Sequence, residues 1–90
     1  STKDANEQFL GEADAVTRTL FEELRRWRLT EAQERGVPAF TVFADATIRD
    51  VAKAKPRTLR QLGALRGVGA YKLDRYGPDV LRVVREQVGS

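Results

Sequence analysis

The spacing of apolar residues along the chain predicts helices. From about residue 14, apolar side chains recur three or four positions apart, which places them on one face of a helix. They are Val16, Leu20, Phe21, Leu24 and Trp27. Gly36 is expected to end this helix, because glycine readily adopts the left-handed conformation and Pro38 prevents continuation. Residues 1–12 lack a sustained period and are expected to form a linker or frayed terminus.

The middle of the chain predicts two shorter helices after an irregular segment. The run FTVF at 40–43 is too short and isolated to pair as a strand, so we expect an extended or 3-10 segment there. A helix is predicted over 45–55, with Asp45 as its N-cap and Pro56 as its end. The sequence TLRQ at 58–61 has the form of a capping box and begins the next helix, which Gly67 stops.

Two more helices are predicted near the C-terminus. They cover residues 70–76 and 78–88, because Gly77-Pro78 combines a helix stop with a residue suited to a first helical position. The last helix has the apolar residues Val80, Leu81, Val84 and Val88. The pattern therefore predicts an all-α fold, a compact bundle of five helices that forms a single domain over 13–88, followed by a tail at 89–90.

Composition limits the possible chemistry. Ninety residues with 41% hydrophobic content can form one core, and the absence of cysteine and histidine removes disulfides, thiolate nucleophiles and the usual zinc ligands. Glu22 and Glu23 are adjacent and do not share a helix face, while Glu31 and Glu34 lack a third ligand. We expect no catalytic residues, no metal site and no cofactor. No apolar run could span a membrane, and the absence of methionine suggests a piece of a longer protein.

The net charge of +3 is distributed unevenly. Residues 1–24 hold six acidic and two basic side chains, whereas residues 53–75 hold seven basic side chains and only Asp74 as an acid. This asymmetry indicates a surface that faces a polyanion, although a charged run of this kind can also be a merely solvated helix surface.

The stretch LRGVGAYKLDRYG at 65–77 contains a glycine pair that has two interpretations. The spacing of Gly67 and Gly69 fits neither a dinucleotide fingerprint nor a Walker loop. The corner could hold a phosphate at the N-terminus of the following helix. Alternatively, the glycines only make the turn that lets Leu65, Val68 and Leu73 pack in the core.

An ordered set of motifs resembles the HRDC family, the helicase and RNase D C-terminal domain. The motifs are VPxF at 37–40, FxDATxR at 43–49 and LxxLRGVGxxKLxRYG at 62–77. The resemblance implies a five-helix bundle without catalytic activity, most like the domain of bacterial RecQ-type DNA helicases. It implies an accessory role in DNA repair and recombination, in which the domain binds single-stranded or forked DNA and tunes the substrate choice of the parent helicase.

Two alternatives remain beside this DNA-binding function. The domain could dock on other domains of the parent helicase through its acidic first helix or its basic face, with little direct DNA binding. It could also be the RNA-binding domain of an RNase D-like exonuclease. In each case we expect a monomeric isolated domain from the bacterial cytoplasm, associated with the nucleoid where the ligand is DNA.

The candidate site combines phosphate-binding cations with an aromatic that stacks on a base. Its residues are Phe40, Lys53, Lys55, Arg57, Arg60, Arg66, Tyr71, Lys72 and Arg75. Phe40 occupies a position where the resemblance implies an aromatic, often tyrosine. Tyr71 is expected to be the most exposed aromatic, whereas Trp27, Phe21 and Phe43 are assigned to the core and Tyr76 is expected to be half-buried.

Overall fold

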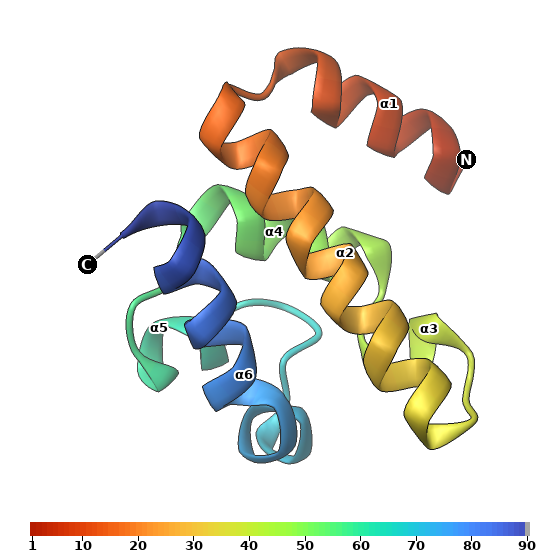
Figure 1. Cartoon of the computed structure of the whole chain (residues 1–90), viewed down its shortest axis with the longest axis vertical. Coiled ribbons are helices and arrows are strands. Elements are labelled where there is room, and N and C mark those ends of the chain that lie inside the picture. The colour runs from red at the N-terminus through yellow and green to blue at the C-terminus, as the bar shows by residue number, and fades with distance from the viewer. Residues whose placement is uncertain (90) are drawn as a thin grey trace.

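The computed structural model describes residues 1–89, and this part of the chain is folded into helices without strands (Figure 1). Ser90, which the sequence analysis placed in a tail, lies outside the described residues. The helices are α1 (Thr2–Glu12), α2 (Ala15–Arg35), α3 (Ala39–Val42), α4 (Asp45–Ala54), α5 (Leu59–Gly63) and α6 (Ala70–Val88). The all-α prediction is confirmed, and residues 1–89 form six helices instead of the predicted five.

Helix α2 runs through the middle of the molecule and organises the core (Figure 1). It packs against α3, α4 and α6, while α5 packs on α6 and α1 on α4. The predicted apolar stripe of α2 is buried at Leu20, Phe21 and Leu24. Trp27 continues the stripe and meets Tyr76 edge to face, with their ring centres 5.7 Å apart. Val16, which the periodicity assigned to the same stripe, is instead 46% exposed, so the pattern identified the buried face correctly only from Leu20 onward.

The first twelve residues differ from the expected linker, because they form α1. Ser1 caps the helix by accepting a hydrogen bond of 3.2 Å from the Asp4 backbone N–H. Phe9 packs its ring 5.1 Å from that of Phe21. The buried Asn6 donates a hydrogen bond of 2.9 Å to Asp45. Contacts with residues that are distant in the chain hold this helix in place. Its own sequence therefore needs no strong periodicity of apolar residues.

Helix α6 also differs from the prediction, because it continues through Gly77-Pro78 as one helix. Tyr76, Gly77 and Val80 are all buried, so an unbroken helix keeps one apolar face against the core on both sides of Pro78. At Gly77 a Cβ would lie 2.7 Å from Leu59 Cδ2. This glycine therefore permits the close approach of α5 and does not stop the helix.

The segment at 39–42 forms a single helical turn, and the two helix caps predicted after it are only partly correct. Asp45 is the first residue of α4 and does not cap it, since Ala44 is the N-cap and has no side-chain hydrogen bond to offer. The capping box at 58–61 forms one of its two bonds, in which Thr58 accepts from the Gln61 N–H at 3.1 Å. The Gln61 side chain accepts instead from the Arg57 N–H at 2.7 Å.

Of the glycine pair, only Gly67 has a strict backbone requirement. Helix α5 ends at Gly63, before the predicted stop, and Gly67 has a left-handed φ of 77°. A Cβ at Gly67 would also collide with Thr47 Oγ1. Gly69 has an extended φ of −81°, and an added Cβ would meet no atom within 4 Å.

We expect Gly67→Ala to lower the free energy of unfolding by about 1–3 kcal/mol, because it combines left-handed strain with a steric collision. Gly69→Ala is the matched control and should change it by less than about 0.5 kcal/mol. Urea denaturation of both variants measures the difference. Equal losses would contradict this assignment of the turn to Gly67.

Candidate nucleic-acid interface

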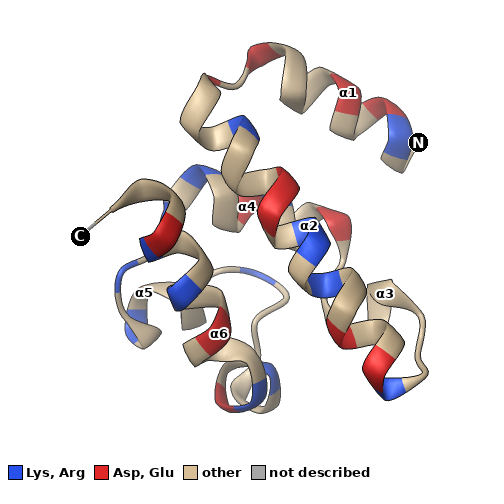
Figure 2. Cartoon of the chain, in the orientation of Figure 1, with Lys and Arg blue, Asp and Glu red and all other residues tan. Residues whose placement is uncertain are grey.

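The junction of α4 and α5 gathers four of the predicted cations, which we call the basic corner: Lys53, Lys55, Arg57 and Arg60. Lys55 ends α4 in the left-handed conformation and the buried Pro56 follows, so the chain turns sharply here. Figure 2 shows basic residues along the end of α4 and α5. Lys53, Arg57 and Arg60 are exposed.

Within residues 1–89, no member of the basic corner forms an ion pair. The Lys55 Nζ donates to Thr17 Oγ1 at 2.6 Å, and the Arg57 guanidinium donates to the Gly89 carbonyl. Neither acceptor is a carboxylate. Asp14 nonetheless lies near enough that, after its hydrogen bonds from Thr17, the positive charge of Lys55 also lowers its pKa. The corner can still attract phosphate.

The start of α6 forms a second group, composed of Tyr71, Lys72 and Arg75. Tyr71 is 60% exposed, and its hydroxyl accepts a long hydrogen bond of 3.4 Å from Arg35 on α2. The Lys72 Nζ lies 5.5 Å from the centre of the Phe43 ring, so part of this side chain covers the core. No side chain caps the helix at Gly69, and the first N–H groups of α6 remain open to an anion.

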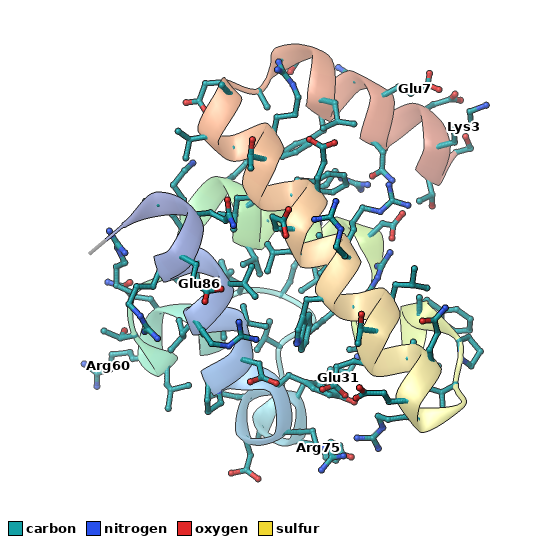
Figure 3. The ribbon with its side chains drawn as sticks, viewed as in Figure 1. Lys3, Glu7, Glu31, Arg60, Arg75 and Glu86 are labelled. Carbon is teal, nitrogen blue, oxygen red and sulfur yellow. The ribbon has the colours of Figure 1, made fainter. Side chains whose placement is uncertain are left out.

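The nine predicted residues do not form one patch. In Figure 3, Arg60 and Arg75 project from different edges of the molecule. Arg66 is engaged in an ion pair of 2.7 Å with Asp50. Phe40 lies on α3, across the molecule from α5 (Figure 1). At 69% it is more exposed than Tyr71, which contradicts the expected order.

Arg35 joins the α6 group although it lies outside the basic stretch 53–75. Only the packing of α2 against α6 brings it beside Tyr71, and no local sequence signal marked it. Tyr76, expected to be half-buried, is almost fully buried at 5% exposure. It therefore belongs to the core and not to the interface.

A buried ion pair beneath the surface was not expected from the sequence. Arg28, which is 6% exposed, lies 2.7 Å from Asp45 Oδ1 and donates to the Phe43 carbonyl at 2.8 Å. Burial alone would raise the pKa of Asp45. The hydrogen bonds that Asp45 accepts from Asn6 and Arg28, together with the positive charge of Arg28, lower this pKa below its usual value. This pair fixes α2 to α4.

The fold defines a small helical domain that carries the basic corner between α4 and α5. The family model of the HRDC domain matches residues 17–84, so the chain belongs to the HRDC family. Within the described residues, no helix is long and apolar enough to cross a bilayer.

Its relatives include helicases of two kinds. The ATP-dependent DNA helicase UvrD2 of Mycobacterium tuberculosis is 44% identical over 70 residues, which cover 78% of this chain and 10% of that protein. The ATP-dependent DNA helicase RecQ of Bacillus subtilis is 40% identical over 67 residues, 72% of this chain and 11% of that one. This chain thus spans about a tenth of the length of these relatives.

The structure is similar to the D. radiodurans RecQ HRDC domain 3. The TM-score is 0.79 with 32% identity, and the match covers 82% of this chain and 97% of the other. The HRDC resemblance inferred from the motifs is therefore confirmed, and with it the assignment to an accessory domain of helicases and RNase D.

Proposed function

We propose that this HRDC domain binds single-stranded or forked DNA for a bacterial helicase of the RecQ or UvrD2 kind and tunes the substrates that the helicase selects. The observation that carries the proposal is the basic corner, where four cations within eight residues have no carboxylate partner among residues 1–89. Cations without such partners bind phosphate and release the counterions of the strand.

The aromatic residues would add to this affinity without reading sequence. Tyr71 is exposed beside Arg35, Lys72 and Arg75, and a base stacked on such a ring contributes about 1–3 kcal/mol. Every base has a face that can stack, so we expect tolerance of sequence. Phe40 offers a second exposed ring on α3, separate from the cations.

We expect a steep salt dependence for the isolated chain. A labelled single-stranded oligonucleotide, titrated by fluorescence anisotropy at about 50 and 200 mM salt, should lose roughly 50-fold in affinity if four phosphates are contacted. An affinity that does not change with salt would contradict the proposal. A parallel titration with RNA of the same sequence separates a DNA-binding domain from one suited to an RNase D-type parent.

A docking role is the second candidate, and exposed apolar residues favour it. Leu29 is 52% exposed on α2, and Val37 and Phe40 are exposed beside α3. Exposed apolar residues that gather on one surface are typical of protein interaction sites. In that case the isolated chain would bind no oligonucleotide at either salt concentration, while deletion of the domain would still alter the parent's choice among DNA structures.

A further inference from the structure

A groove of about 490 Å³ lies between α1, the start of α2 and α4. One wall consists of Gln8, Phe9 and Glu12 of α1, and the opposite wall consists of Arg49, Lys53 and Lys55. Helix α1 precedes residues 17–84, the range that matches the family model. The groove is therefore built partly by a helix outside the shared family core.

The α4 wall of the groove is cationic. Arg49 and Lys53 are four residues apart on a helix and so share a face, and Lys55 follows at the end of α4. The Lys55 ammonium is held at Thr17 Oγ1, and the Arg49 guanidinium donates to Asn6. Lys53 has no hydrogen-bond or ion-pair partner within residues 1–89. Three positive charges thus line one side of a single hollow.

The other side of the groove carries the carboxylates of Glu12 and Asp14. Asp14 caps α2 by accepting from the Thr17 N–H at 2.8 Å, and this backbone hydrogen bond lowers the pKa of Asp14, which keeps it charged. A strand that passed through the groove would bring successive phosphates against these carboxylates. A strand that ends in the groove would place only one phosphate on the cationic wall.

We propose that this groove binds the terminal phosphate of a DNA strand, whose neighbouring phosphates lie on Arg57 and Arg60. The inference rests on the proposed DNA-binding function and adds strand ends as the preferred substrate. A terminal phosphate monoester carries about 1.5 to 2 negative charges, against one for an internal phosphodiester. The three cations of the α4 wall outnumber the two carboxylates of Glu12 and Asp14, so a phosphate placed against that wall, away from the carboxylates, gains from its extra charge. Phe9, half-buried against Phe21, offers apolar surface to the terminal sugar.

The test compares three oligonucleotides of one sequence with an internal label: one with a 5′-phosphate, one with a 3′-phosphate and one with both ends unphosphorylated. We expect the full chain to bind one phosphorylated form about tenfold more tightly than the unphosphorylated form. Lys53→Gln should bring this ratio close to one, and Lys53→Arg should retain it. Arg75→Gln, outside the groove, should preserve the ratio even if it weakens all three complexes. Circular dichroism verifies that each variant is folded.

The outcomes separate the two proposals. Equal affinities for the three oligonucleotides would overturn the terminal-phosphate site and leave DNA binding in place. A ratio that survives Lys53→Gln would also overturn it, because the preference would then arise elsewhere. Failure of all three oligonucleotides to bind would overturn both proposals.

Discussion

Arg28→Met is expected to lower the free energy of unfolding by about 3–5 kcal/mol, a large part of the stability of a domain of this size. The substitution leaves the Asp45 carboxylate without its cation at 2.7 Å and removes the donor to the Phe43 carbonyl. The removed side chain is 6% exposed, so water cannot readily replace these bonds. Urea denaturation measures the loss.

Asp45→Asn provides the matched comparison. The double variant with Arg28→Met should be more stable than the sum of the single losses indicates, because no carboxylate is then left unpaired. The native pKa of Asp45 lies below its unfolded value of about 3.9. The carboxylate therefore stabilises the fold above that pH, and this contribution is lost as the pH falls through the native pKa. A purely additive cycle would contradict the proposed coupling.

Lys53→Glu combined with Arg57→Glu should weaken single-stranded DNA binding by about tenfold to 100-fold at low salt. Both side chains are exposed members of the basic corner, and neither has a carboxylate partner within residues 1–89. Reversal of their charges would remove the two proposed phosphate contacts and introduce two repulsive groups. Fluorescence anisotropy with a labelled oligonucleotide measures the change in Kd.

Arg26→Glu combined with Arg82→Glu is the control with the same change in net charge. Arg26 pairs with Glu23, and Arg82 with Glu86 at 3.1 Å, so both cations are already compensated. We expect only about a twofold to threefold loss, due to the altered field of the whole molecule. Equal losses in the two pairs would mean that net charge, and not the basic corner, governs the affinity.

The surfaces proposed for DNA binding and for docking lie on different parts of this domain. The basic corner and the start of α6 carry the cations, whereas Leu29 and Phe40 expose apolar area near α3. Leu29→Ser therefore tests the docking surface without altering the basic corner or either exposed aromatic ring. The separation arises because α3 and α5 lie on opposite sides of the molecule (Figure 1).

The sequence by itself determined the helical class, the family and the buried face of α2. These features are encoded locally, because apolar spacing defines a helix face and Gly67 must adopt a left-handed φ. The position of the basic corner was also predictable, since its four cations lie within eight residues. Neighbours in the chain remain neighbours in the fold whatever the tertiary arrangement.

Only the tertiary structure decided the features that join distant residues. Helix α1 is held by Phe21 and Asp45, and α6 continues through Pro78 because both of its halves bury residues on one core face. The Arg28–Asp45 pair joins residues 17 positions apart, and Arg35 meets Tyr71 across 36 positions. Local propensity cannot encode such contacts, since they form only when the fold brings residues that are distant in the chain next to each other.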